Sequence, residues 1–155
     1  MLAARARVEA PRAGPTPADY DGAVTERLSL PARLRIRRTG DFARAYREGA
    51  RARGMVLVVV ARPNGLDHPR LGLSVGRAIW RSAVRRNRVK RIFREAFRLE
   101  QHALPPGYDL VLIPAAPRLE PSLDEARAEL VRLARKAVRR CEERLARERG
   151  APLAD

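Results

Sequence analysis

The segment from residue 77 to residue 98 constrains the fold more than any other, because it makes two opposite demands. Its apolar residues recur at helical spacing and predict a helix with one buried face: Val89, Ile92, Phe93, Ala96 and Phe97. The same segment holds nine basic residues and one acidic residue, Glu95. Like charges one turn apart repel each other in an isolated helix. The segment therefore predicts a helix that packs on a core along one side and meets an anion elsewhere.

Most of the positive charge of the chain lies in and around this segment. The 155 residues include 33 Lys+Arg and 18 Asp+Glu, for a net charge of +15, of which +13 falls in residues 29–121. The last helical segment, by contrast, has eight basic and six acidic residues between Ser122 and Glu148. This imbalance indicates an anionic partner, with nucleic acid ahead of an acidic membrane surface. The hydrophobic fraction of 45% is enough for a core and argues against a wholly disordered basic tail.

Several classes of enzyme are disfavoured by missing motifs. With Cys141 as the only cysteine, neither an internal disulfide nor a Cys-based zinc site is expected. The chain has no GxSxG elbow, no GxxxxGK[ST] loop and no GxGxxG loop, and no catalytic constellation stands out. The apolar runs are too short for a membrane span, and no signal peptide is recognisable. A cytoplasmic protein is therefore expected.

Local patterns predict three helices. Thr39 is the predicted cap of a short helix over residues 41–47, which Gly49 ends. Ser82 is the predicted cap of the basic helix, which reaches about Leu99. The spacing of Ser122 and Glu125 predicts a capping box at the start of the last helix.

Between these helices, apolar runs predict strands. Residues 55–60 and 108–113 have the composition of buried strands, and residues 71–75 alternate apolar side chains with Gly72 and Ser74. A further strand is expected between Leu57 and Val75. The resulting order predicts a single small α+β domain over residues 29–148 with one sheet. Residues 1–28 are predicted to be a disordered extension and residues 149–155 a tail.

The sequence allows two roles for some residues. Phe42 and Tyr46 share a helix face, either as core contacts or as a stacking surface for an unpaired base. Gly72 permits either close helix–sheet packing or close approach of RNA. Helical geometry places four residues on the outer side of the helix, opposite the core: Asn87, Arg91, Arg94 and Arg98. Arg85 and Arg86 are expected to overhang the core and point into a groove.

The basic helix contains a specific set of motifs, Arg86-Asn87-Arg88, Lys90-Arg91 and Arg94-Glu95-Ala96-Phe97-Arg98. This set, in order with three other segments, resembles the bacterial ribonuclease P protein subunit. The supporting matches are Arg70-Leu-Gly-Leu-Ser-Val75, Asp41-Phe42 with Tyr46 and Gly49, and Tyr108-Asp109-Leu110-Val111. The resemblance covers roughly residues 28–140. One departure is that Arg77 and Ala78 stand where the family has two lysines, and whether Arg81 replaces the missing contact is open.

The resemblance implies a fold and a function. The fold is αβββαβα, with a four-stranded sheet and a left-handed βαβ crossover around the basic helix, against the usual right-handed rule. The function is that of the protein subunit of an endoribonuclease that removes the 5′ leader of precursor tRNA. The catalytic groups belong to the RNA subunit, which also binds most of the Mg²⁺. The implied partners are this catalytic RNA and precursor tRNA, with no membrane and no protein partner.

The basic cluster and the resemblance together give the predicted site residues. The predicted RNA-binding set is Arg77, Arg81, Arg85, Arg86, Asn87, Arg88, Lys90, Arg91 and Arg94. The predicted cleft for the precursor leader is lined by Phe42, Tyr46, Leu57 and Val59. No catalytic residue and no metal ligand of the protein is assigned.

Three other classes of protein compete with this interpretation. A structural RNA-binding protein, such as a ribosomal protein, fits the charge equally well. The strands on either side of the basic helix count against a DNA-binding helix-turn-helix protein. The missing site residues count against an enzyme that acts alone.

Overall fold

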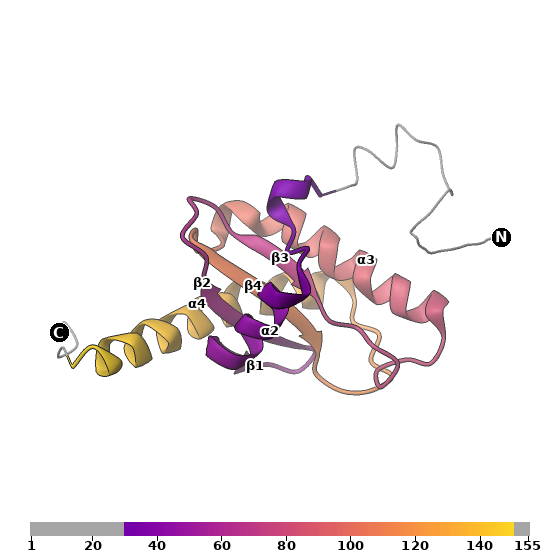
Figure 1. Ribbon diagram of the computed structural model, residues 1–155. Coiled ribbons are helices and arrows are strands. Elements are labelled where there is room, and N and C mark those ends of the chain that lie inside the picture. Colours follow the sequence, from indigo (N-terminus) through magenta and orange to yellow (C-terminus); the bar gives the residue numbers. More distant parts are fainter. Residues whose placement is uncertain (1–29, 151–155) are drawn as a thin grey trace. The chain divides into compact units, whose positions relative to one another are not determined.

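The computed structural model describes residues 30–150, so the predicted extension over residues 1–28 lies outside the described part (Figure 1). The elements follow in the order η1 (Ala32–Leu34), α2 (Thr39–Glu48), β1 (Ala50–Arg53), β2 (Leu57–Pro63), β3 (Arg70–Leu73), α3 (Ala83–Glu100), η2 (Gln101–Ala103), β4 (Tyr108–Pro114) and α4 (Leu123–Glu148). The predicted α+β class is confirmed, as is the order αβββαβα that the resemblance implied.

The four strands form one mixed sheet in the order β1-β2-β4-β3. β2 is antiparallel to both β1 and β4, whereas β3 and β4 are parallel. Parallel strands need a crossover connection, and α3 supplies it between β3 and β4. The hand of this crossover stays a prediction. The sheet therefore sets the basic helix beside its β3 edge.

The additional strand is β1, which precedes Leu57, so the expected position between Leu57 and Val75 is wrong. β1 has the sequence Ala-Arg-Ala-Arg, in which Ala50 and Ala52 are buried while Arg51 and Arg53 are exposed. This edge strand contains no β-branched residue, and such residues are the usual signal of a strand. Its pairing with β2 therefore comes from the tertiary structure rather than from its own propensity.

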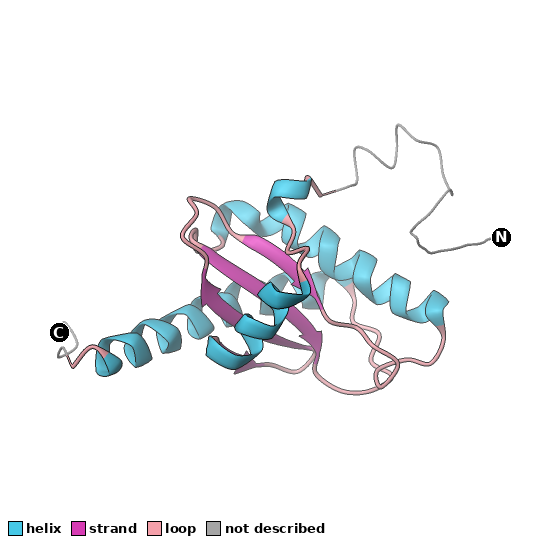
Figure 2. Cartoon of the chain, in the orientation of Figure 1, coloured by secondary structure: helices cyan, strands magenta, loops and turns pink. Residues whose placement is uncertain are grey.

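Helices cover both faces of the sheet (Figure 2), with α2 in front and both α3 and α4 behind. Val60 and Val111 lie on the α2 side, in a cluster with Ile36 and Ala45. Neighbouring positions along a strand point to opposite faces, so Leu57, Val59, Leu110 and Leu112 lie on the side of α3 and α4. All four are fully buried. This burial on both sides explains the uninterrupted apolar runs of β2 and β4.

The helix ends confirm two of the three predicted caps. Ser82 accepts a hydrogen bond from the Arg85 N–H, and Ser122 and Glu125 form both bonds of a capping box. The predicted cap at Thr39 is wrong, because α2 begins at Thr39 and Arg38 holds the cap position without a side-chain bond. At α3 and α4 the serine hydroxyl accepts a backbone N–H of the first turn, whereas at α2 no side chain makes such a bond.

Gly49 ends α2, as predicted, for a reason that lies in packing. A Cβ atom at this position would lie 2.5 Å from the Ala45 oxygen and 2.8 Å from the Ala61 oxygen. Glycine thus permits the chain to pass from α2 directly into β1, close against β2.

Candidate nucleic-acid interface

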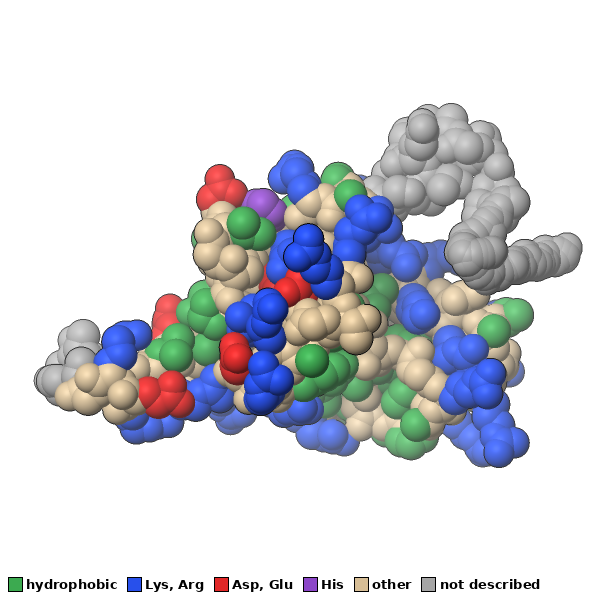
Figure 3. All heavy atoms as spheres, in the orientation of Figure 1, with side chains coloured by type: hydrophobic (Ala, Val, Ile, Leu, Met, Phe, Trp, Pro, Cys, Tyr) green, Lys and Arg blue, Asp and Glu red, His purple; other side chains and the backbone are tan. Residues whose placement is uncertain are grey.

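The buried face of α3 determines where its basic residues lie. Val89, Phe93, Ala96 and Phe97 are fully buried, as the apolar spacing predicted. The remaining positions hold the cations on the flanks and on the outer side of the helix. Figure 3 shows Lys and Arg side chains gathered at the end of the domain where α3 begins.

A row of three cations runs along one flank of α3. Arg86, Lys90 and Arg94 follow one another at four-residue spacing, and all three are partly buried. Burial lowers the pKa of Lys90, and the charges of Arg86 and Arg94 lower it further. Burial also lowers the pKa of Arg94, together with the charges of Arg35 and Arg91. Within residues 30–150, none of the three forms an ion pair, and we call this row the α3 ridge.

Arg94 was expected on the outer side of α3, and this expectation is wrong. It lies on the flank beside Arg35, which belongs to the connection between η1 and α2. That connection runs along β3, because Arg35 forms a bridge with Leu71 and the Ile36 N–H donates to the Leu71 oxygen at 2.8 Å. The sheet edge therefore brings a cation from a distant segment next to the α3 ridge.

Arg85 and Arg86, expected together in a groove, separate in the structure. The Arg86 guanidinium donates to the backbone oxygens of Trp80 at 2.9 Å and Arg81 at 2.8 Å, which ties the preceding loop to α3. Arg85 lies over the Trp80 ring at 4.8 Å and pairs with Glu120. The lining of a shallow hollow thus includes Arg85 but not Arg86, together with Arg77, Arg81 and Arg118.

Two of the residues predicted on the outer side of α3, Asn87 and Arg91, are exposed. Arg88 is exposed as well and approaches Glu120 at 3.6 Å. Arg98, expected beside them, is instead held by Glu95 through two hydrogen bonds of 2.9 and 2.5 Å. Sequence reasoning missed both Arg118 and Glu120, because no local pattern connects them with α3.

The aromatic part of the predicted site lies on the opposite face of the sheet. Phe42 packs over Gly72, where a Cβ atom would lie 2.9 Å from the Phe42 ring and 2.9 Å from Ile36. Tyr46 is 36% exposed, and the Arg51 guanidinium lies 5.8 Å from its ring centre. Of the two interpretations of Gly72, the structure therefore supports close helix–sheet packing. Of the two aromatic side chains, Tyr46 alone is exposed.

The predicted floor of the leader cleft, Leu57 and Val59, is wrong. Both side chains have no exposed surface, and they point to the face that α3 and α4 cover. Their neighbours Val58 and Val60 lie on the same face as Phe42. Because β2 is apolar on both faces, its sequence does not indicate which residues face α2. The predicted floor residues are therefore each one position away from the residues that face Phe42.

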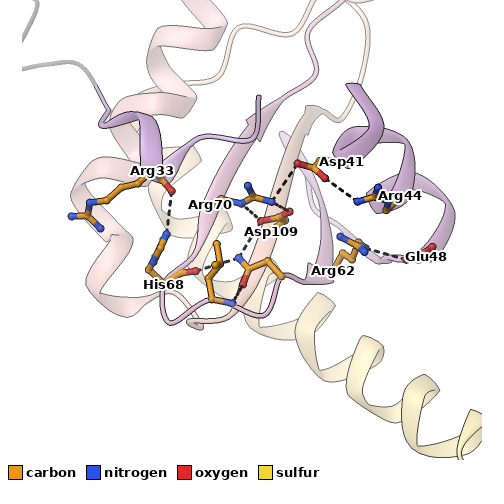
Figure 4. Close-up of polar contacts among 10 residues, drawn as sticks. Arg33, Asp41, Arg44, Glu48, Arg62, His68, Arg70 and Asp109 are labelled. Carbon is orange, nitrogen blue, oxygen red and sulfur yellow. Dashed lines mark hydrogen bonds and ion pairs between the residues drawn. The ribbon is translucent and has the colours of Figure 1, made fainter. Parts of the chain in front are cut away.

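An ion-pair network fixes α2 on the sheet (Figure 4). The Arg70 guanidinium donates twice to Asp109, with both bonds at 2.7 Å, and lies 3.6 Å from Asp41 of α2. Asp109 is fully buried and also accepts from Asn64 at 3.1 Å. The bond to Asp109 raises the pKa of Arg70. Phe42 therefore sits beside a charged anchor that joins α2, β3 and β4.

Two further kinds of feature concern the described residues, a metal centre and a membrane-spanning helix. No group of three His, Cys, Asp or Glu side chains is placed to hold a metal ion within residues 30–150. None of the helices in the described part combines the length and the apolar character that a membrane crossing requires.

The fold and the α3 ridge define a small α+β protein with a cationic helix at the edge of a mixed sheet. The Ribonuclease P family model matches residues 30–138. The ribonuclease P protein component of Pseudoalteromonas translucida is 36% identical over 116 residues, 75% of this chain and 82% of that protein. The component of Thermotoga maritima is 43% identical over 91 residues, 59% of this chain and 75% of that protein. The chain belongs to the ribonuclease P protein family.

Solved structures agree with this assignment. The RNase P protein of Thermotoga maritima, solved with 1-(4-fluorophenyl)-2-thiourea, is 35% identical, with a TM-score of 0.50 over 72% of this chain and 95% of that one. A mutant RNase P protein of Staphylococcus aureus is 26% identical, with a TM-score of 0.60 over 76% and 94% of the two chains.

Proposed function

We propose that the chain is the protein subunit of ribonuclease P and binds the catalytic RNA through α3. The observation that carries this proposal is the α3 ridge, where Arg86, Lys90 and Arg94 lie partly buried without a carboxylate partner among the described residues. A row of cations that repel one another is relieved when phosphates bind beside it. Arg88 and Arg91, exposed on the outer side, extend the same contact.

We further propose that the leader of precursor tRNA binds near α2. Tyr46 offers a partly exposed ring with Arg51 beside it, an arrangement suited to stacking an unpaired base and contacting its phosphate. Phe42 forms the wall of this region, held by Gly72 and Ile36. Leader and catalytic RNA thus meet the protein on opposite sides of the η1–α2 connection.

In this proposal the protein does no chemistry of its own. Mg²⁺, bound mainly by the RNA, supplies the activation of water and the stabilisation of the leaving oxygen. The residues of this chain position the RNA and the leader, and the reaction is the endonucleolytic removal of the 5′ leader. We place it in the cytoplasm.

The test is leader removal by ribonuclease P RNA at low Mg²⁺ concentration, with and without the protein. We expect the purified protein to stimulate cleavage, because its cations offset phosphate repulsion that Mg²⁺ otherwise screens. The variant R88Q/R91Q removes two exposed cations of α3 and should lose most of this stimulation. The control R147Q/R149Q removes two exposed cations beyond the domain core and should retain it.

Binding without stimulation would contradict the proposal. In that case the protein would be a structural RNA-binding protein, such as a ribosomal protein. Equal loss in the two variants would show that net charge, and not α3, governs the effect.

A further inference from the structure

The charge of α4 is balanced in total but not along its length. Its six acidic residues lie at positions 124–129 and 142–148. The intervening residues 130–141 contain five basic residues and no acidic one. The overall balance, which suggested an ordinary solvated helix, therefore hides a cationic stretch in the middle of α4.

Glu129, the acidic residue just before the cationic stretch, binds backbone N–H groups of another segment. The Glu129 carboxylate accepts the backbone N–H groups of Met55, Val56 and Leu57 at 2.8, 3.0 and 3.2 Å. Its side chain is 12% exposed, and it lies 3.6 Å from Arg132, which is 58% exposed. A carboxylate shared among three backbone donors neutralises a neighbouring guanidinium weakly. Glu129 thus caps the β1–β2 turn and leaves the cationic stretch mostly uncompensated.

Four of the five cations share the outer side of α4. They line one shallow hollow together with Ala128 and Val131, and they are Arg132, Arg135, Lys136 and Arg139. They lie opposite the buried Leu130, Ala134 and Ala137. We call these four residues the α4 patch.

The five cations of this stretch differ in the contacts they make within the fold. Arg140 donates to the Arg51 oxygen at 2.7 Å and so belongs to the contact with β1. Arg135 reaches the Ala103 oxygen at 3.2 Å. Over the described part of the chain, Lys136 and Arg139 form no ion pair. Lys136 and Arg139 are therefore cations of the patch that make no ion pair within the described fold.

We propose that the α4 patch binds the phosphodiester backbone of RNA, as a second contact surface besides the α3 ridge. At about 1.5 Å per residue, Arg132 and Arg139 are separated by about 10 Å along the helix, enough to follow several phosphates of one strand. The α3 ridge faces Arg35 at the β3 edge, whereas α4 packs on α3, β1 and β2 with its buried side and holds the patch on the opposite side. The two surfaces therefore engage different stretches of RNA. The inference rests on the proposed function, in which this RNA is the catalytic subunit.

The first experiment measures how binding to ribonuclease P RNA depends on salt. The logarithm of the affinity falls linearly with the logarithm of the salt concentration. In K136Q/R139Q we expect this slope to become shallower by about 2, because each phosphate contact contributes about one to its magnitude. Glutamine keeps the helix propensity close to that of Lys and Arg. The control R147Q/R149Q makes the same change in net charge at the C-terminal end of the same helix and should retain the wild-type slope.

The second experiment maps the contact by directed hydroxyl-radical cleavage. An iron chelate attached through R139C should cut a different stretch of RNA from one attached through R91C. Cys141 is fully buried, and burial raises the pKa of its thiol, so the label attaches at the introduced cysteine. Labelled wild-type protein gives the background. Cleavage from position 139 no stronger than this background would overturn the proposal.

The outcomes separate the two hypotheses. A wild-type protein that binds ribonuclease P RNA no more tightly than unrelated RNA overturns the proposed function, and with it the identity of the RNA. A specific wild-type complex with equal slopes for both double variants overturns the α4 assignment alone. Loss of binding to phosphatidylserine-containing vesicles in K136Q/R139Q, with an unchanged RNA slope, overturns it in favour of a lipid surface.

Discussion

Lys90 shows at the scale of one residue how binding and stability oppose each other. It lies one turn from Arg86 and one turn from Arg94, partly buried, and burial together with these charges lowers its pKa. The folded protein therefore releases the Lys90 proton at a lower pH than the unfolded chain does. The charged form destabilises the fold at neutral pH, and this cost disappears as the pH rises through the lowered pKa towards 10.5.

Replacing this residue should separate the two effects. We expect K90M to raise the free energy of unfolding by about 0.5–1 kcal/mol, because two repulsive pairs disappear. The same change should weaken binding to ribonuclease P RNA. Urea unfolding and an RNA titration measure the two quantities.

The control for this change is R98M, because the hydrogen-bonded Glu95 carboxylate raises the pKa of Arg98 and the charge of Arg98 is therefore favourable in the fold. It should not stabilise the protein. A K90M protein less stable than wild type would contradict the interpretation of the α3 ridge.

At the scale of elements, the position of α2 depends on two contacts with β3. Arg70 of β3 holds Asp41, and Gly72 of β3 leaves room for the Phe42 ring. The charged contact sets where α2 begins, and the glycine sets how closely it approaches the sheet. The aromatic wall of the proposed leader site is thus a property of helix–sheet packing.

A methyl group at Gly72 tests this arrangement. In G72A the new Cβ would lie 2.9 Å from Phe42 and 2.9 Å from Ile36, so the ring must move. We expect a loss of about 1–3 kcal/mol in stability. Binding of leader-bearing precursor should weaken more than binding of mature tRNA.

G76A serves as the matched control, because nothing lies within 4 Å of a Cβ at Gly76. It should leave both stability and the ratio of the two affinities near wild type. Equal losses for precursor and mature tRNA in G72A would assign Phe42 a role in the core only.

For the whole molecule, the net charge of +15 makes the free protein repel itself. The Debye length falls from about 30 Å at 0.01 M salt to about 8 Å at 0.15 M, so added salt weakens repulsion between distant cations first. The partly buried pair of Arg70 and Asp109 is screened much less. Salt should therefore relieve the unfavourable interactions more than the favourable ones.

We expect the melting temperature of the free protein to rise between these two salt concentrations. A gain of about 1 kcal/mol corresponds to roughly 4 °C for a domain of this size. The rise should be smaller in K136Q/R139Q, which carries two fewer cations. A melting temperature that falls with salt would mean that surface ion pairs outweigh the repulsion.

Local patterns predicted much of the fold because they depend on neighbours in the chain. The apolar spacing of α3, the Ser82 cap and the capping box at Ser122 each involve residues within one or two helical turns. The exposure of Asn87, Arg88 and Arg91 follows from the same helical geometry. β1 escaped prediction, because its alternating Ala and Arg residues carry no strand signal of their own.

The sequence by itself determined the helices, the apolar strands, the excess of cations on α3 and the resemblance to one family. Only the tertiary structure decided which cations remain without partners. Glu120 reaches Arg85 across 35 positions, and the Glu129 carboxylate, 3.6 Å from Arg132, also accepts backbone N–H groups of the β1–β2 turn. It also decided that Val60, and not Val59, shares a face with Phe42. Pairing and facing depend on distances between segments far apart in the chain, which local spacing does not encode.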